Sequence, residues 1–542
     1  MPISTKRNVI FQPLTYQKFQ KGIHQIVDIV RPTLGPKSSM VAIERINKDK
    51  APELLDSGGV IVRRIIQIPD RDADMGAMFL RQVLWRVYKE VGDGTVTTAV
   101  LFQSVYDQGV HYITAGGNAM RLRYYLEEGM KLILNELSKL TVQVEGKESL
   151  AQIALSICYD PSLAKLMGEI FDIIGQYGIL DIRTGRGRHL EREYVEGIYW
   201  DNGVITRDMI TDPVSQKVEL ENVAVLISNL SIDDPQSLLP IFESVLQADI
   251  HSMLIFGSEF SGTVIGLLMA ANKDPSKFRV IGVKTLGVSL IDQTAAMQDL
   301  AVLTGGQPRV KAAGDTLNGL TFNDLGQVRK VRAGYHYVSL FGGKGDPRQL
   351  RAHLTSLHAA FDREEDLDQR KKIQKRIGKL MGGSATLWIG AATETEITYR
   401  QELAERTADA VRAALREGVL PGGGVALLAC RPVLREKFHQ STEPDERAAY
   451  QILIKTMEAP IRAILTNAGL DASDVMAELR LAGDNRGYNV MTGKIVNMME
   501  AGIFDVAAVV KSALRGAISS AALALTTDIL IHHKKPVQAL EP

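Results

Sequence analysis

Short apolar strands alternate with amphipathic helices between Gly178 and about Gln327, whereas the chain on either side of this segment is mostly helical. The alternating elements are expected at Val223–Ser228, Leu238–Ala248, Met253–Gly257, Gly262–Asn272 and Val280–Lys284. This order predicts a parallel, doubly wound α/β unit that folds on its own. Because a domain averages about 150 residues, a chain of 542 residues is expected to hold three or four domains. We therefore expect a multi-domain α+β protein.

The two flanks carry helical patterns. We expect helices over Tyr16–Val30, Arg121–Leu140, Asp160–Tyr177, Arg348–Leu380, Glu396–Glu417 and the small-residue stretch Ala507–Thr527. A further helical stripe, which we interpret as core, consists of Met75, Phe79, Val83 and Val87. Val41–Ile43 is typical of a short strand, and Asp56–Gly59 of a hairpin or loop. The charges at 363–366 and 371–372 are expected on a solvated helix face.

Charge and cysteine content exclude several classes of protein. Lys plus Arg and Asp plus Glu both total 63, so the overall charge favours neither nucleic acid nor an anionic membrane surface. Cys158 and Cys430 have no metal-ligand spacing and cannot form a disulfide framework, which indicates a reducing compartment. No apolar run approaches the roughly 18 residues of a membrane helix, and residues 1–20 lack the apolar core of a secretory signal. We expect a cytoplasmic protein.

The sequence Gly92-Asp93-Gly94-Thr95 has the composition of a phosphate-binding loop. Its two glycines allow the backbone to turn tightly and to bring N–H groups close to an anion. Asp93 fits beside phosphate if it holds Mg²⁺, which prefers oxygen ligands shared between carboxylates and phosphates. A plain turn between two helices is the alternative, because short glycine-rich matches are weak evidence.

Five motifs occur along the chain in a distinctive order: Thr33–Lys37, Gly92–Thr95, Gly390–Glu394, Gly422–Leu427 and Gly487–Asn489. In order and spacing they resemble those of the group I chaperonins, the GroEL family, of which this sequence is identified as a divergent member. The resemblance implies a chaperonin-like subunit with an all-α equatorial domain, a small α/β intermediate domain and an α/β apical domain. The implied boundaries are equatorial 1–139 and 418–531, intermediate 140–196 and 383–417, apical 197–382, and a tail at 532–542.

The resemblance also implies a function. Family members bind ATP and Mg²⁺ in the equatorial domain, capture non-native polypeptides on apical apolar helices, and assemble into stacked seven-membered rings that a co-chaperonin lid can close. Asp93 would hold Mg²⁺. The implied nucleotide-binding residues are Thr33, Leu34, Gly35, Pro36, Ser57, Asp93, Gly94, Thr95, Val96, Thr97, Gly423, Asn489, Val490, Met491 and Asp505.

The apical positions only partly follow the family. The implied polypeptide-binding residues are Leu239, Phe242, Ile265, Met269 and Ala270. An exposed apolar stripe on a helix is typical of a binding surface, although the same residues could be buried against the apical sheet. In an upstream segment the aromatic residues of the family are replaced by Val204, Asp208 and Met209.

The largest departure concerns hydrolysis. The family's water-activating aspartate lies in the helix before the triple-glycine loop, and that position is Arg406. Arginine stays protonated and cannot act as a general base, so we expect slow or absent hydrolysis, with Asp409 as a substitute base. A second family aspartate falls at Ser57 or Gly58, with Asp56 just upstream. Arg406 could instead simply pair with Glu402 and Asp409 on a helix surface.

Three functions follow from these observations. The first is a chaperonin-type ATPase that assists folding but hydrolyses ATP slowly. The second is a non-hydrolysing paralogue that acts as a binding or structural module in homo-oligomeric rings. The third, a small-molecule kinase, is disfavoured because the sequence lacks the G-x-x-x-x-G-K-[ST] motif.

Overall fold

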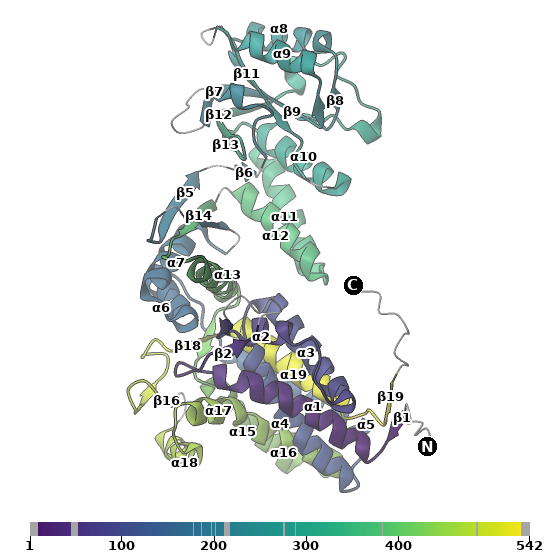
Figure 1. Ribbon diagram of the computed structural model, residues 1–542, viewed down its shortest axis with the longest axis vertical. Helices are drawn as coiled ribbons and strands as arrows, with labels where there is room; N and C mark the ends of the chain where they lie inside the picture. Colours follow the sequence, from purple (N-terminus) through teal and green to yellow (C-terminus); the bar gives the residue numbers. More distant parts are fainter. Residues whose placement is uncertain are drawn as a thin grey trace. The chain divides into compact units, whose positions relative to one another are not determined.

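The computed structural model describes residues 9–44, 52–176, 178–185, 187–196, 198–200, 202–210, 217–274, 277–287, 289–381, 383–483 and 486–532. The chain forms two compact units (Figure 1). The discontinuous unit comprises Met1–Asp172 and Thr398–Pro542, and the central unit comprises Ile173–Ile397. The multi-domain α+β class is thereby confirmed, whereas the boundaries of a separate intermediate domain stay a prediction.

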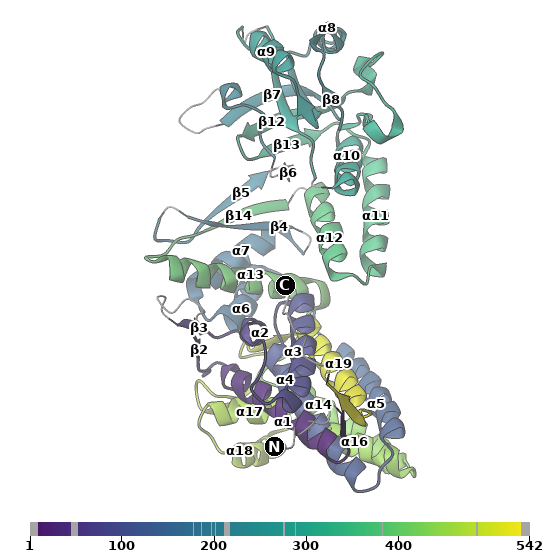
Figure 2. The ribbon, with the colours of Figure 1, turned by 45° about the vertical axis from the view of Figure 1, so that its right-hand side comes forward.

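Long helices from both ends of the chain build the discontinuous unit. They are α1 (Leu14–Val30), α3 (Arg71–Val91), α4 (Thr95–Thr114), α5 (Ala119–Leu140), α16 (Pro444–Thr456) and α19 (Ala507–Ala524). Figures 1 and 2 show α19 among α3, α4 and α5, so the last long helix packs against the first ones. Helices α1 and α3 touch backbone to backbone, because a Cβ added at Gly22 would lie 1.9 Å from the Ala73 carbonyl oxygen.

Helix α19 is long and apolar enough to cross a membrane by length and composition alone. Of its 18 residues, 67% are buried inside the protein. Its alanines allow close approach to α3, α4 and α5, and they lie in the main core of the discontinuous unit. It therefore fits the core helix of a globular unit, and the prediction of a tightly packed small-residue stretch is confirmed.

Shorter elements complete this unit. The helices are α2 (Gly58–Arg64), α6 (Lys147–Cys158), α7 (Pro161–Ile174), α13 (Glu394–Glu417), α14 (Val425–Ala429), α15 (Arg431–Gln440), α17 (Ala459–Asn467) and α18 (Ala472–Ala482). The strand pairs are β1 (Val9–Phe11) with β19 (Ile529–Ile531), β2 (Val41–Ile43) with β3 (Glu53–Leu55), β15 (Val419–Pro421) with β18 (Phe504–Val506), and β16 (Arg486–Asn489) with β17 (Lys494–Asn497).

The prediction of a hairpin or loop at Asp56–Gly59 is wrong for its second half, because Gly58 and Gly59 begin α2. These glycines serve close packing and not a turn. A Cβ at Gly59 would lie 2.2 Å from Cδ2 of Tyr88, and a Cβ at Gly58 would lie 2.6 Å from Cγ2 of Val96. The sequence pattern alone cannot distinguish these two uses of glycine.

The central unit contains a six-stranded sheet with strand order β11-β9-β7-β12-β13-β6. Its strands are β6 (Ile198–Trp200), β7 (Lys217–Leu226), β9 (Ser252–Gly257), β11 (Arg279–Lys284), β12 (Gly326–Gly334) and β13 (Val338–Gly343). The prediction of a parallel, doubly wound sheet is wrong for half of these strands. Strands β7, β9 and β11 are parallel because α8 (Leu239–Gln247) and α9 (Gly262–Ala271) connect them, whereas β12, β13 and β6 are antiparallel.

The central unit also contains a three-stranded sheet, three further helices and a short parallel pair of β8 (Ser231–Ile232) and β10 (Glu259–Phe260). The sheet has the order β4 (Ile179–Thr184), β14 (Gly383–Ile389) and β5 (Glu191–Glu196). The helices are α10 (Leu290–Thr304), α11 (Pro347–Arg363) and α12 (Leu367–Met381). Residues 364–366, which we expected on a helix face, lie in the turn between α11 and α12.

A buried carboxylate on α10 joins these three helices. Asp299 accepts hydrogen bonds from Nε and Nη2 of Arg376 on α12, at 2.9 and 2.8 Å. Its Oδ1 also lies 2.8 Å from Nε2 of His353 on α11. Asp299 is nearly fully buried, so this ion pair is shielded from solvent and fixes α10 relative to the α11–α12 hairpin.

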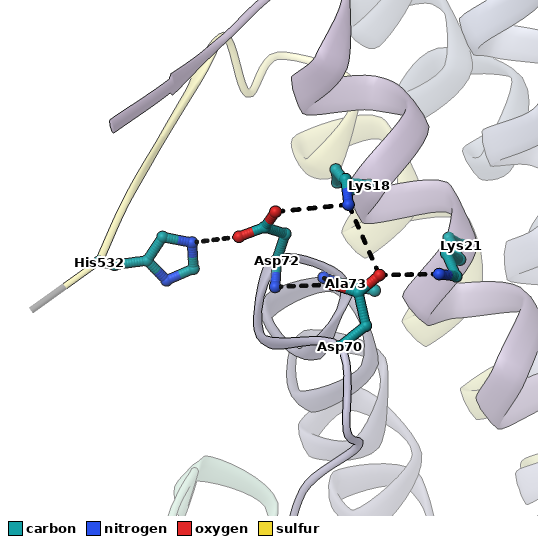
Figure 3. Close-up of polar contacts among 6 residues, drawn as sticks. All are labelled: Lys18, Lys21, Asp70, Asp72, Ala73 and His532. Atoms are coloured by element: carbon teal, nitrogen blue, oxygen red, sulfur yellow. Dashed lines mark hydrogen bonds and ion pairs between the residues drawn. The ribbon is translucent and has the colours of Figure 1, made fainter. Parts of the chain in front are cut away.

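The start of α3 is held by a polar cluster that also includes the end of the described chain (Figure 3). Asp70 caps the helix by accepting from the backbone N–H groups of Asp72 and Ala73, and it pairs with Lys21 at 2.7 Å. His532, which we placed in the tail, is instead buried with its Nε2 3.0 Å from Oδ1 of Asp72. The remainder of the predicted tail, 533–542, lies outside the described residues.

We expect Asp70→Ala to destabilise the discontinuous unit by about 1 kcal/mol, because the substitution removes a helix N-cap. Asp70→Asn keeps an N-cap oxygen and is expected to cost only a few tenths of that amount at neutral pH.

The hydrogen bond from Lys21 and the two capping amides outweigh burial and lower the pKa of Asp70 to about 2. The stability that its charge contributes is therefore present above about pH 4 and is lost as the pH falls towards 2. Amide hydrogen exchange of α3 across this pH range measures the stability of the helix in the wild type and in both variants. An equal loss of stability in Asp70→Ala and Asp70→Asn would contradict the capping role.

Candidate functional site

The predicted phosphate loop lies between α3 and α4. Gly92 and Gly94 have φ values of 75° and 79°, which confirms that both turn positions require the conformational freedom of glycine. A Cβ at Gly94 would also lie 2.7 Å from Cγ1 of Val509 on α19. Thr95 begins α4, and its Oγ1 is buried without a hydrogen-bond partner among the described residues. An unsatisfied hydroxyl at a helix N-terminus suits a phosphate oxygen.

The turn at 33–36 is tied to the C-terminal half of the chain. The side-chain amide of Asn467 on α17 donates to the carbonyl oxygens of Arg31 and Leu34, at 2.8 and 2.9 Å. Thr33 donates its hydroxyl to the carbonyl of Val30 at 2.8 Å, and Gly35 adopts a φ of 93°. Asn467 could not be identified from the sequence, because nothing in its local pattern links it to a turn more than 400 residues earlier.

The triple-glycine loop lies beside Asp505. In the β15–β18 pair Leu420 faces Asp505, and the backbone N–H groups of Gly423 and Gly424 donate to the Asp505 carboxyl. Burial, together with the charge of Asp93, outweighs these two hydrogen bonds and raises the pKa of Asp505 to about 6. The loop and Asp505 therefore form one polar wall, and Asp93 of the phosphate loop is near enough for its charge to act on Asp505.

The β16–β17 hairpin packs against this wall. A Cβ at Gly487 would lie 2.5 Å from Cγ2 of Val425, the residue after the triple glycine. The side-chain oxygen of Asn489 accepts hydrogen bonds from the backbone N–H groups of Met491 and Thr492, at 3.0 and 3.3 Å, which shapes the turn. Val490 is buried in a small apolar cluster with Ile461, so its side chain packs in the core, whereas Met491 is exposed.

Arg406 lies on α13 with only 10% of its side chain exposed. Its Nη2 is 3.4 Å from Oδ2 of Asp56, and Tyr399 donates its hydroxyl to the same carboxylate oxygen at 3.2 Å. Burial lowers the pKa of Arg406, but the charges of Asp56 and Asp93 outweigh this effect and leave the pKa above its usual value. A permanent cation is thus held close to the carboxylate expected to bind Mg²⁺.

The ion partner of Arg406 among the described residues is Asp56, so the alternative of a surface pair with Glu402 and Asp409 is wrong. Asp409 packs on the phosphate loop: a Cβ at Gly92 would lie 3.0 Å from its Cβ. One of its oxygens accepts from Nη1 of Arg412 at 2.9 Å. Asp409 is therefore a carboxylate next to the loop: its Oδ2 would lie 3.8 Å from a Cβ at Gly92, and 42% of its side chain is exposed.

Two tyrosines of this region are absent from the residues predicted from the sequence. Tyr399 precedes Arg406 by two helical turns, so the spacing could have placed it on the same face. Tyr159 lies between α6 and α7 in the left-handed conformation, with a φ of 51°, which is uncommon for a side chain of this size. Partial burial and the charges of Asp93 and Asp505 raise its pKa to about 12. No local pattern marks Tyr159, since its position depends on the turn between the two helices.

These residues fit a nucleotide with Mg²⁺. Glycine turns at Gly92, Gly94 and Gly35, an unsatisfied Thr95 hydroxyl and the N-terminus of α4 suit phosphates. The described residues contain no group of three or more His, Cys, Asp or Glu side chains that could hold a metal alone. A cation at Asp93 would therefore share its coordination with phosphate oxygens, as Mg²⁺ commonly does.

The helices α8 and α9 of the central unit only partly present the predicted polypeptide-binding residues. Leu239 is exposed, and Leu246 is exposed two turns further along α8. The expectation that Phe242 lies on the exposed surface is wrong. Phe242 is 7% exposed and its ring packs on Phe278, because it turns towards the sheet. On α9, Ala270 is exposed and Ile265 and Met269 are partly buried.

The upstream segment of the central unit presents little apolar surface. Val204 and Met209 are buried in the core of the unit, and Asp208 is exposed. The positions where the family carries aromatic residues therefore add no apolar contact area here.

Comparison with known proteins gives two results. The sequence profile of the TCP-1/cpn60 chaperonin family matches residues 26–248 and 276–535. The fold is similar to crystal structures of the chaperonin gp146 from the bacteriophage EL 2 (Pseudomonas aeruginosa) in the presence of ATP-BeFx. Crystal form I gives a TM-score of 0.69 and 19% identity over 98% of this chain and 100% of that chain. Crystal form II gives a TM-score of 0.64 and 20% identity over 97% and 99% of the respective chains.

Proposed function

Because this chain belongs to the TCP-1/cpn60 chaperonin family, we propose that it is an ATP-binding chaperonin that captures non-native polypeptides and hydrolyses ATP slowly. The observation that carries this proposal is the buried Arg406–Asp56 pair beside the phosphate loop. Capture would use the exposed apolar residues of α8 and α9, of which Leu239 is the clearest. We further propose homo-oligomeric rings, stacked and seven-membered as in the resembling family, with a co-chaperonin lid as a candidate partner.

Nucleotide binding is proposed to use both ends of the chain. The phosphates would contact the loop at 92–97 and the turn at 33–36, and the nucleoside would contact Gly423, Asn489, Met491 and Asp505. Mg²⁺ held by Asp93 would neutralise phosphate charge when bound. The Thr95 hydroxyl would orient the phosphates, since it is buried without a hydrogen-bond partner among the described residues, and the amides at the N-terminus of α4 would add further donors.

Slow hydrolysis follows from the charges around the loop. A general base must accept a proton from the attacking water, and a guanidinium cannot do so. Asp56 is engaged by Arg406 and by Tyr399, so one of its oxygens already accepts two partners. Asp409 is the remaining candidate base, with one oxygen held by Arg412. The loss of a positioned base typically lowers a rate by about 10² to 10⁴.

A second function is favoured by the same observation. Arg406 is buried and its positive charge lies near Asp93. A cation in this position strengthens the retention of anionic phosphates without promoting water attack. The chain would then act as a non-hydrolysing binding or structural module of a ring. The two functions differ in whether the wild-type protein releases phosphate.

Nucleotide binding itself is tested with Asp93→Ala. We expect the full-length protein to bind ATP in the presence of Mg²⁺, and this variant to bind at least about tenfold more weakly, since it loses the carboxylate that shares Mg²⁺ with the phosphates. Asp474→Ala, which removes an exposed carboxylate on α18 of the same unit, is the matched control. Isothermal titration with and without Mg²⁺ measures both. Equal affinities for the two variants would contradict the role of Asp93.

A further inference from the structure

The outer face of α10 exposes two adjacent large aliphatic side chains. Leu290 is 70% exposed and Ile291 is 82% exposed in the first turn of the helix. A shallow pocket of about 370 Å³ lies over this face, lined by Leu290, Ile291, Thr294, Ala295 and Gln298. We call these five residues the α10 face. Single exposed apolar residues are common, but an adjacent pair that lines a pocket is typical of a binding surface.

The chemistry of the α10 face selects an apolar ligand. Thr294 donates its hydroxyl to the carbonyl of Leu290 at 2.8 Å, so its methyl group is left to line the pocket. None of the five lining residues is charged. The nearest acidic residue in sequence, Asp292, is engaged by Lys372 on α12 at 3.1 Å and by Ser289 at 2.8 Å. An aliphatic or aromatic side chain fits this environment better than an ion or a polar group does.

The inner side of α10 holds this face in place. Met297 and Leu300 are buried in the core of the central unit, and Asp299 is bound by Arg376 and His353. The outer residues are therefore presented on a rigid helix. A surface that is already ordered loses less conformational entropy when a ligand binds.

The size of the α10 face decides between occupants. A stable interface between folded partners uses about 20–30 residues on each side. The pocket is lined by five residues of one helix, which falls far short of this number, so the pocket by itself does not provide a stable interface for a second folded copy of the chain or for another globular partner. A short apolar segment of an extended chain needs only a few anchoring side chains, as in helix and strand recognition grooves.

We propose that the α10 face is a second capture site for apolar segments of non-native polypeptides, separate from the residues exposed on α8 and α9. This inference rests on the proposed chaperonin function. Figures 1 and 2 both show α10 next to α11 and α12 and away from α8 and α9. An unfolded chain carries several apolar segments, so two sites on one central unit bind it more tightly than either site alone, because the second contact is intramolecular.

The test compares three variants of the full-length protein without nucleotide. The probe is fluorescein-labelled lactalbumin that has been reduced and carboxymethylated, so that it stays unfolded. Leu290→Ser with Ile291→Ser is expected to weaken probe binding by about tenfold, since two large apolar contacts are lost. Leu239→Ser with Leu246→Ser tests the α8 surface. Leu481→Ser is the matched control, because Leu481 is 90% exposed on α18 of the other unit.

A photoreactive benzoylphenylalanine in place of Gln298 identifies what occupies the α10 face. Crosslinking to the labelled probe supports the inference, and crosslinking to a second copy of the chain overturns it. If the α8 variant loses binding while the α10 variant binds normally, the second site is refuted and the chaperonin function stands. If the wild-type protein does not bind the probe at all, the proposed function itself fails. Unchanged amide exchange of α11 and α12 verifies that the α10 variant is folded.

Discussion

Replacing Arg406 with aspartate should raise the steady-state rate of ATP hydrolysis by about 10² or more. The substitution removes a guanidinium that cannot accept a proton and installs a carboxylate at the same position on α13. It also releases Asp56, whose carboxylate is now paired with Arg406 at 3.4 Å. Phosphate release by purified protein with Mg²⁺ and ATP measures the rate, and a parallel titration measures nucleotide affinity.

Two further variants test separately the removal of the cation and the role of Asp409 as the substitute base. Arg406→Ala removes the cation without adding a base, so it should not reproduce the increase given by aspartate. Asp409→Asn should abolish any residual wild-type activity if Asp409 is the substitute base, since the amide cannot accept the proton. If the wild type hydrolyses ATP at a rate that Arg406→Asp does not raise, another residue supplies the base. If the wild type binds but does not hydrolyse ATP and aspartate restores turnover, the non-hydrolysing module is correct.

The sequence predicts the loops of the candidate site better than the tertiary contacts between distant residues of the site. Gly92 and Gly94 were predicted to need unusual backbone freedom, and both have positive φ values. Arg406 was placed by its spacing from the flanking motifs. Its partner Asp56 was not, because the two residues are 350 positions apart and only tertiary packing brings them together. Contacts of this kind leave no local pattern in a single sequence.

In the central unit, the sequence does not predict the strand order or which side chains are exposed. The alternation of strands and helices correctly predicted β7, β9 and β11, but not that the sheet continues with antiparallel strands, since strand order depends on contacts outside the alternating segment. The resemblance also failed for Phe242, which the family pattern placed on the binding surface but which is buried here, because an apolar stripe alone could lie on either face of α8. The exposure of Leu290 and Ile291 was not predicted from the sequence, because it is set by the packing of the opposite side of α10.

Asp299→Ala should destabilise the central unit by about 3 kcal/mol, which makes it the largest stability effect that we expect. The substitution leaves the guanidinium of Arg376 without the carboxylate that binds both its Nε and Nη2 atoms. It also removes the partner of His353. Unfolding of a chain with two units is not expected to be two-state, so amide hydrogen exchange of α10, α11 and α12 is the appropriate measurement.

The cause of this effect is tested by removing both charges together. The double variant Asp299→Leu with Arg376→Met should recover most of the lost stability, because no unpaired charge is left beside the core. Asp292→Ala on the same helix removes a pair with Lys372 that is exposed to solvent, and it should cost less than about 1 kcal/mol. If the double variant is as unstable as Asp299→Ala, the loss arises from packing and not from an unpaired charge. If Asp292→Ala is equally harmful, burial does not distinguish the two ion pairs. The contrast between two aspartates seven residues apart on one helix thus separates the contribution of a buried pair from that of an exposed one.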